Sequence, residues 1–198
     1  MERELLLTGI GGQGVQLAAN VLAHAALTEG RDVQLFGSYG GMMRGGNTDA
    51  ELVIADERIA APPTVGSAWA AIALHPDYAD PVVARVVADG LVLRDAGIWD
   101  APIERSDLRV VDVPAAEMAT AVGNVMAASM VMLGALAALT GLVGIDSLRD
   151  GVRACVPPYR QQHLELNDRA LQAGVDAFEP LPAGEAWPSG SLVGNGRP

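Results

Sequence analysis

The sequence predicts an α/β protein, with a Rossmann-like, mostly parallel sheet flanked by helices, C-terminal helices and an extended tail. Short apolar runs of strand length alternate with longer segments in which apolar residues recur at helical spacing. A glycine-rich turn joins the first apolar run to the first helical segment. Hydrophobic residues make up 50% of the chain and aromatic residues only 4%, so the core must consist of small aliphatic side chains that let helices lie close to a sheet.

Apolar runs predict strands at residues 5–7, 33–36, 50–55, 69–74, 91–93 and 109–113. Helices are predicted at residues 14–29, 76–88, 124–139, 146–155 and 161–178, with Pro81 delaying or kinking the second of them. Gly30 is expected to end the first helix, and Asp146 to cap the start of the fourth. The first strand, first helix and second strand then form a βαβ unit, whose parallel crossover is right-handed by default.

The chain is predicted to be a single domain at residues 1–179 with a tail at residues 180–198. The tail is rich in Pro, Gly and Ser and is expected to be ordered only if it docks on something. Residues 118–145 contain no charged residue and are long enough to cross a bilayer. Their many glycines and alanines, with no basic residues close by, favour a buried helix and no membrane span. The N-terminus has no signal-peptide character, so a cytoplasmic location is expected.

Charge and composition argue against several functions. A formal net charge of −11 makes nucleic acid an improbable partner, because phosphate contacts need a surplus of Lys and Arg. The single cysteine, Cys155, excludes an internal disulfide and argues against an iron–sulfur cluster in this chain. His24, His75 and His163 lack zinc-type spacing, so no metal ligand is predicted and each is interpreted as a buried or surface residue. No nucleophile–base pair stands out, and no catalytic residue is predicted.

The first candidate site is the turn at residues 9–14, Gly-Ile-Gly-Gly-Gln-Gly, which fits the G-x-G-x-x-G pattern between a strand and a helix. Such glycines permit a tight turn and a close ligand approach, and the helix N-terminus offers free N–H groups to a phosphate. Dinucleotide binding would also need an acidic residue at the end of the second strand. Asp32 lies at the start of that strand instead, which weakens the case for NAD or FAD. The alternative is a turn used only for close packing of helix on strand.

The second candidate site is the segment at residues 37–48, which has no helix or strand period and is predicted to be a loop. It should leave the carboxyl end of the second strand, where open α/β sheets bind ligands. Arg44 between flexible glycines could offer a planar guanidinium to phosphate or carboxylate, and Ser38, Asn47 and Thr48 add neutral hydrogen-bonding groups. The alternative is a mobile surface loop with a solvated arginine.

A set of segments in a fixed order carries a family resemblance. They are residues 8–15, 38–40, 43–46, 51–59 with Pro62, 123–124, 130–136, and Asn167, Ala170 and Gly174 in the last predicted helix. Over residues 3–178 these segments resemble the gamma subunit, or gamma domain, of 2-oxoacid:ferredoxin oxidoreductases. Two departures are Gly41, where many members have proline, and residues 125–129, which are less polar than is usual in the family.

The resemblance implies that this chain is a subunit of a complex that oxidatively decarboxylates a 2-oxoacid to an acyl-CoA and carbon dioxide. Thiamine diphosphate, Mg²⁺ and [4Fe-4S] clusters would reside in partner alpha, beta and ferredoxin-like delta-type subunits, with ferredoxin or another electron acceptor. This chain would bind no cofactor alone and would help to hold coenzyme A as substrate. The residues that the resemblance assigns to that site are Gly11, Gly12, Gln13, Gly14, Val15, Ser38, Arg44, Gly45, Gly46 and Asn47.

Two alternatives to this hypothesis remain open. A free-standing nucleotide-dependent oxidoreductase would bind NAD(P)H by itself, which the missing ribose-binding acid argues against. A structural assembly module would hold no ligand, and replacing Arg44 with Ala would then leave the activity of the complex unchanged.

Overall fold

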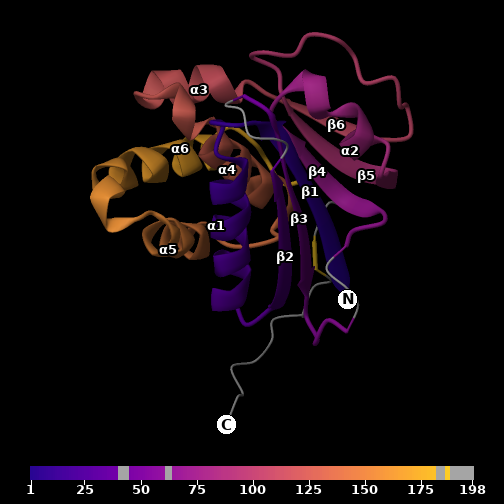
Figure 1. Ribbon diagram of the computed structural model, residues 1–198, viewed down its shortest axis with the longest axis horizontal. Coiled ribbons are helices and arrows are strands. Elements are labelled where there is room, and N and C mark those ends of the chain that lie inside the picture. Colours follow the sequence, from indigo (N-terminus) through magenta and orange to yellow (C-terminus); the bar gives the residue numbers. More distant parts are fainter. Residues whose placement is uncertain (40–44, 61–63, 182–185, 188–198) are drawn as a thin grey trace.

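The computed structural model describes residues 1–39, 45–60, 64–181 and 186–187, which form a six-stranded mixed sheet with helices on both faces (Figure 1). The strands lie in the order β2-β3-β1-β4-β5-β6. Their bounds are β1 Glu2–Ile10, β2 Asp32–Tyr39, β3 Asn47–Ala55, β4 Ala68–Ala73, β5 Val86–Asp95 and β6 Arg109–Val113. The predicted α/β architecture is therefore confirmed.

The sheet is mostly parallel, as predicted. Strands β1, β4, β5 and β6 pair in parallel, while β3 runs antiparallel to both of its neighbours, β1 and β2. Strand β2 consequently points the same way as β1, but β3 lies between them. The predicted βαβ unit, β1–α1–β2, is present, but its two strands are not neighbours. Strand β3 follows β2 in the chain and lies between β2 and β1, pairing with each of them.

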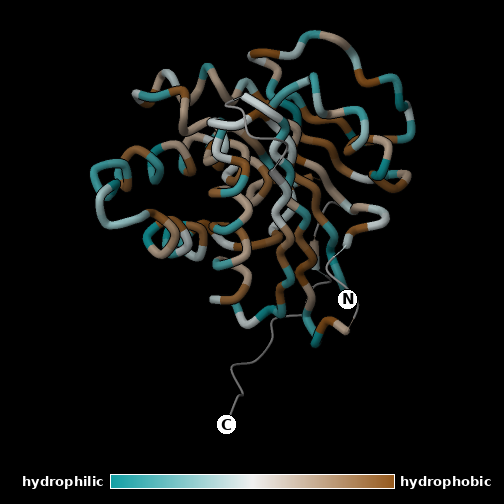
Figure 2. The backbone as a smooth tube through the Cα atoms, in the orientation of Figure 1, coloured by the Kyte–Doolittle hydropathy of each residue, from teal (hydrophilic) through white to brown (hydrophobic). Residues whose placement is uncertain are grey.

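Helices α1 Val15–Thr28, α4 Ala128–Thr140, α5 Ile145–Cys155 and α6 Leu164–Asp176 lie on one side of the sheet (Figure 1). Helix α5 packs mainly against α1, and α6 packs mainly against α4. The short helix α2 Asp80–Val83 and the 3-10 turn η1 Pro76–Tyr78 lie against the other face, over a smaller core. Helix α3 Ala115–Val122 follows β6, and two further 3-10 turns, η2 Val125–Ala127 and η3 Pro158–His163, precede α4 and α6. Figure 2 shows apolar residues concentrated along the strands and along the sides of the helices that face them.

Helix α1 ends where the sequence predicts. Gly30 has φ 81°, a left-handed conformation that costs glycine little. The N–H of Gly30 donates to the carbonyl of Leu27, and the N–H of Arg31 donates to the carbonyl of Ala26. This pair of hydrogen bonds is the Schellman arrangement, which satisfies carbonyl groups left free at a helix C-terminus.

Several predicted boundaries are wrong. The helix expected at residues 76–88 is only η1 and α2, because the chain enters β5 at Val86. Gly144 rather than Asp146 is the N-cap of α5, and Asp146 lies in its first turn. Much of the segment at residues 37–48 belongs to strands, since β2 continues to Tyr39 and β3 begins at Asn47. Backbone pairing between these two strands overrides the weak strand propensity of Gly37 in β2 and of Asn47 in β3.

The uncharged stretch at residues 118–145 contributes the buried helix α4, as predicted. None of the helices in the described ranges is long and apolar enough to cross a bilayer. Helix α4 packs against α6 with glycine on both sides. A Cβ at Gly134 would lie 2.1 Å from the carbonyl oxygen of Leu171, and a Cβ at Gly174 would lie 2.1 Å from that of Val131.

Part of the predicted tail packs on the domain. The N–H of Ala186 donates to the carbonyl of Thr140 at 2.8 Å, and the indole N–H of Trp187 donates to the carbonyl of Leu142 at 2.9 Å. The guanidinium of Arg31 lies over the Trp187 ring, 3.8 Å from its centroid. These contacts extend the core beyond the predicted domain boundary at residue 179.

Candidate functional site

The glycine-rich turn connects the last residue of β1, Ile10, to the first residue of α1, Val15. Gly12 and Gly14 both have positive φ, at 110° and 81°, so the backbone here takes conformations that residues with a Cβ rarely adopt. Gly14 is also the N-cap of α1 and provides no side-chain oxygen to its N–H groups. The predicted strand–turn–helix context of this motif is confirmed.

Gln13 holds the turn in shape. Its side-chain oxygen accepts from the N–H of Ile10 at 2.8 Å, and its side-chain amide donates to the carbonyl of Leu74 at 2.9 Å. Its own N–H donates to the carbonyl of Ile10. Gln13 therefore ties the end of β1 to the residue that follows β4, and both ends of its amide are engaged within the protein.

The turn also contacts the segment that enters β3. The N–H of Gly11 donates to the carbonyl of Gly46 at 2.9 Å. A Cβ at Gly11 would lie 3.3 Å from the nitrogen of Gly45, a distance that leaves little room for a side chain. The two sequence-predicted candidate sites are therefore adjacent in the structure.

The N-terminus of α1 is electrostatically uncompensated. The first helical hydrogen bond runs from the N–H of Ala18 to the carbonyl of Gly14 at 2.9 Å. The N–H groups of Val15, Gln16 and Leu17 have no acceptor among the described residues. The first turn also contains no acidic side chain. Free N–H groups together with the helix dipole attract an anion to this position.

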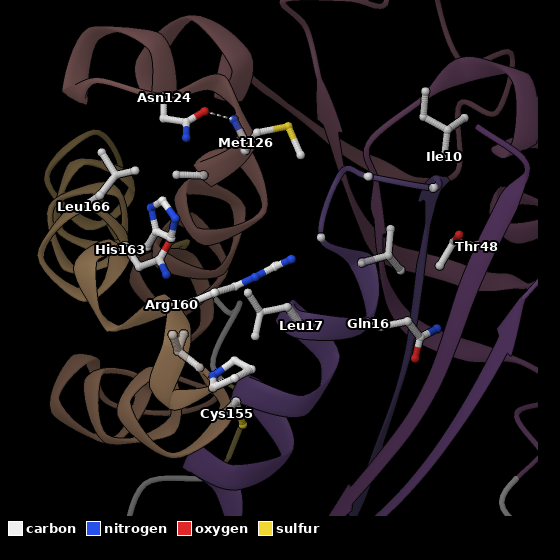
Figure 3. Close-up of a pocket in the computed structure, with 18 residues that line it drawn as sticks. Ile10, Gln16, Leu17, Thr48, Asn124, Met126, Cys155, Arg160, His163 and Leu166 are labelled. Carbon is white, nitrogen blue, oxygen red and sulfur yellow. Dashed lines mark hydrogen bonds between the residues drawn. The ribbon is translucent and has the colours of Figure 1, made fainter. Parts of the chain in front are cut away.

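A cavity of about 630 Å³ opens in front of this helix end (Figure 3). One wall is the glycine-rich turn and the start of α1. The opposite wall comes from η2, the end of α5, η3 and α6. Figure 3 shows Ile10, Gln16 and Thr48 on the first side, facing Asn124, His163 and Leu166 across the space. Cavities of this size commonly hold cofactors and other small molecules.

The cavity lining contains one arginine and one histidine. Arg160 and His163 come from η3, and no Asp or Glu is among the lining residues in the part of the chain that the structure describes. This composition contrasts with the formal net charge of −11 for the whole chain. Arg160 extends from η3 into the space between the two walls (Figure 3). Its guanidinium has no carboxylate or carbonyl partner among the described residues, and only the Tyr159 ring lies beneath it.

Asn167 of α6 supplies an amide to the same cavity. It is only 8% exposed, and its side chain makes no hydrogen bond with any residue in the described ranges. Its amide atoms are not fully buried, so they can offer hydrogen bonds to a polar ligand in the cavity. Asn124 differs, because its side-chain oxygen already accepts from the N–H of Met126 at 3.0 Å (Figure 3).

The structure sorts the sequence-predicted residues into three groups. The cavity is lined by Gly11, Gly12, Gly14 and Val15, together with Thr48. Gln13, Ser38, Gly45, Gly46 and Asn47 are not among its lining residues. Arg44 lies outside the described residues, with the rest of 40–44.

Asn47 and Thr48 face opposite sides of the sheet, because successive residues of a strand alternate. The side-chain amide of Asn47 donates to Asp49 at 2.6 Å, and the Thr8 hydroxyl donates to the same carboxylate at 2.6 Å. Thr48, between Asn47 and Asp49 in the sequence, lines the cavity.

Asp32, the acidic residue at the start of the second strand, lies at the far end of the sheet from the glycine-rich turn, as predicted. Its carboxylate accepts from the N–H of Ile59 at 2.8 Å.

The far wall of the cavity was not predicted from the sequence. Arg160 and His163 follow the Pro157–Pro158 pair, and this cluster of basic residues between two helices was the available signal. Asn167 was noted only as part of the family resemblance. Nothing in local sequence indicates that η3 and α6 face the glycine-rich turn.

Cys155 in the cavity lining and Asp95 at the end of β5 have shifted pKa values. Burial raises the pKa of the Cys155 thiol, which lines the cavity, so the thiol stays protonated at neutral pH and is a weak nucleophile. Burial also raises the pKa of Asp95, although its carboxylate accepts from the N–H groups of Gly97 and Ala116 at 3.1 and 3.3 Å. Asp95 is thus held at the N-terminus of α3 as a structural group.

The described residues contain no cluster of side chains suited to a metal ion.

Comparison with known proteins places these features in a family. The model of the pyruvate ferredoxin/flavodoxin oxidoreductase family matches residues 4–177. Ketoisovalerate oxidoreductase subunit VorA of Methanothermobacter marburgensis is 34% identical over 177 residues, which are 88% of this chain and 36% of VorA. 2-Oxoglutarate synthase subunit KorC of the same organism is 36% identical over 182 residues, covering 88% of this chain and 95% of KorC. The chain therefore spans little more than a third of VorA and nearly all of KorC.

A solved structure agrees with this assignment. The gamma subunit of a keto/oxoacid ferredoxin oxidoreductase from Geobacter sulfurreducens PCA superimposes with a TM-score of 0.74 at 30% identity. The superposition covers 88% of this chain and 96% of that subunit. Taken with the family match over residues 4–177, this similarity shows that the chain belongs to the pyruvate ferredoxin/flavodoxin oxidoreductase family.

Proposed function

We propose that this chain is the gamma-type subunit of a multi-subunit 2-oxoacid oxidoreductase and that its cavity holds part of coenzyme A. The observation that carries the proposal is the cavity at the N-terminus of α1, which Arg160 lines and which no acidic residue of the described ranges lines, in a protein of net charge −11. The diphosphate of coenzyme A is an anion that free helix N–H groups and a glycine-rich turn can bind closely. The similarity to KorC, which is a subunit of 2-oxoglutarate synthase, supports the role of a subunit.

In this complex the reaction would convert a 2-oxoacid and coenzyme A to an acyl-CoA, carbon dioxide and reduced acceptor. Alpha, beta and ferredoxin-like delta-type partner subunits would hold thiamine diphosphate with Mg²⁺ and [4Fe-4S] clusters, which supply decarboxylation and electron transfer. The residues of this chain contribute binding and orientation. Gly11, Gly12, Gly14 and Val15 present backbone to the phosphates, while Gln13 keeps the turn in shape through Ile10 and Leu74.

The segment that contains Arg44 would add a cation on the β3 side of the turn. Its neighbours Gly45 and Gly46 lie against Gly11, which supports a role for Arg44 in the same site. Ser38 and Asn47 lie in the strands on either side of this connection, on the face opposite to Thr48, so their role would be to position the connection. Asn47 positions the start of β3 through Asp49.

The test is to tag the chain in its native host, purify it gently without oxygen, and identify co-purifying proteins by mass spectrometry. The expected result is a complex in fixed ratio that oxidises 2-oxoacids only when coenzyme A is added. A chain that purifies alone and binds NAD(P)H would contradict the proposal and favour a free-standing oxidoreductase.

A second measurement separates a coenzyme A site from an assembly module without a ligand. In the purified complex, Arg44→Ala is expected to raise the KM for coenzyme A about tenfold, because one charge-assisted contact to phosphate is lost. Arg58→Ala is the matched control, since Arg58 is exposed and does not line the cavity. An unchanged KM in both variants would favour the assembly module.

A further inference from the structure

The cavity has cationic character on both walls. On one wall the N-terminus of α1 offers free N–H groups and positive partial charge. On the other wall Arg160 offers a guanidinium that no acceptor in the described ranges engages, with His163 beside it in the lining. Two cationic positions on separate elements suit a ligand with two separate anionic groups.

Coenzyme A has such a charge distribution. Its diphosphate joins the pantetheine arm to the ribose, and a third phosphate is a monoester on the 3′ oxygen of the same ribose. We infer that Arg160 binds the 3′-phosphate of coenzyme A while the α1 N-terminus binds its diphosphate, an assignment that rests on the proposed function. A planar guanidinium can bind two oxygens of a phosphate monoester at once, and a dianionic monoester attracts it strongly.

The rest of the far wall suits the adenosine between these phosphates. Asn167 is nine-tenths buried, and its amide has no partner among the residues that the structure describes, so it can pair with the polar edge of a purine. Leu166, Val156 and Met126 line the same space and supply apolar contact for a flat base. The Asn167 amide atoms are accessible at the cavity wall, so they can bond to a ligand that fills the cavity.

The experiment compares coenzyme A with 3′-dephospho-coenzyme A in the complex purified through this chain. Both molecules carry the reactive thiol, and they differ only in the 3′-phosphate. In the wild-type complex the KM for 3′-dephospho-coenzyme A is expected to be about tenfold higher than that for coenzyme A. Arg160→Ala is expected to raise the KM for coenzyme A to the same value, without changing the KM for 3′-dephospho-coenzyme A or kcat for either.

Controls keep the outcomes distinct. Arg160 is exposed, so its replacement should not impair folding. Arg169→Ala removes the same charge from an exposed position of α6 that does not line the cavity, and it should leave both KM values unchanged. Equal increases for the two thiols in Arg160→Ala, or no increase for either, would overturn the assignment of Arg160 while leaving the coenzyme A function intact. A wild-type complex whose turnover does not depend on either thiol would overturn the proposed function itself.

Discussion

Gly14 packs directly against Ser129, so that a Cβ at Gly14 would lie 2.7 Å from the Ser129 hydroxyl oxygen. This contact sets the N-terminus of α1 against the buried helix α4. The same glycine needs its positive φ of 81° to start the helix. One residue therefore joins the anion-binding end of α1 to the core, and two independent physical reasons exclude a side chain there.

Gly14→Ala is expected to lower the free energy of unfolding by about 2 kcal/mol, through backbone strain and the clash with Ser129. It should also raise the KM of the complex for coenzyme A, because the α1 N-terminus must shift. Gly30→Ala is a matched control, since Gly30 has the same φ of 81° but open space around it. Urea unfolding and steady-state kinetics check both variants. A Gly30→Ala variant with the same kinetic defect would contradict a local effect at the site.

Gln13→Glu is expected to destabilise the turn more than its small change in shape suggests. The new carboxylate can still accept from the N–H of Ile10, but it cannot donate to the carbonyl of Leu74 and would place two acceptors in contact. We expect a loss of about 1–3 kcal/mol in the free energy of unfolding, measured by urea titration. Gln162→Glu makes the same chemical change at an exposed position and should be nearly neutral. Equal stability of the two variants would show that the Gln13 bridge contributes little.

Gly174→Ala is expected to cost about 3 kcal/mol, because a Cβ there would lie 2.1 Å from the carbonyl oxygen of Val131 and would force α6 away from α4. Gly66→Ala provides the control, since Gly66 has open space and no positive φ. Thermal unfolding monitored by circular dichroism distinguishes the two variants. A melting temperature for Gly174→Ala close to that of Gly66→Ala would mean that the helices can separate at little cost.

Asp95 is expected to make folding stability depend on pH. Because burial raises its folded-state pKa above the unfolded value, the folded chain binds the proton more tightly than the unfolded chain. The resulting stability is fully present below the unfolded pKa of about 4 and is lost as the pH rises through the higher folded pKa. Asp95→Asn keeps an oxygen that can accept from Gly97 and Ala116 but does not titrate in this range.

Urea titrations from pH 3 upward test this effect as the difference between wild type and Asp95→Asn. Relative to the variant, the wild-type protein should lose stability as the pH rises over that window. Parallel curves for the two proteins would show that the carboxyl group has the same pKa in the folded and unfolded chains. The neighbouring ion pair between Arg94 and Asp112, at 2.5 Å, is present in both proteins, so it does not contribute to the difference between their curves.

Local sequence predicted the features that local physics determines. Alternation of apolar runs with helical periods predicted the α/β class, and β6 was predicted with its observed bounds at residues 109–113. Gly30 predicted the end of α1 because few other residues take its conformation. The uncharged, glycine-containing stretch predicted the buried helix α4. The glycine-rich turn could be predicted because its backbone conformation requires glycine at Gly12 and Gly14.

Only the tertiary structure decided which elements meet. The insertion of β3 between β1 and β2 depends on pairing between strands, which short apolar segments do not encode individually. The pairing of β3 with its neighbours also directs the Thr48 side chain toward the cavity and the Asn47 side chain away from it. The approach of η3 and α6 to the glycine-rich turn depends on packing around α4, far along the chain. Arg160 and Asn167 therefore became candidate ligand-binding residues only in the tertiary structure. A cavity brings together residues that are far apart in the sequence, and no helical or strand periodicity predicts which of them will meet.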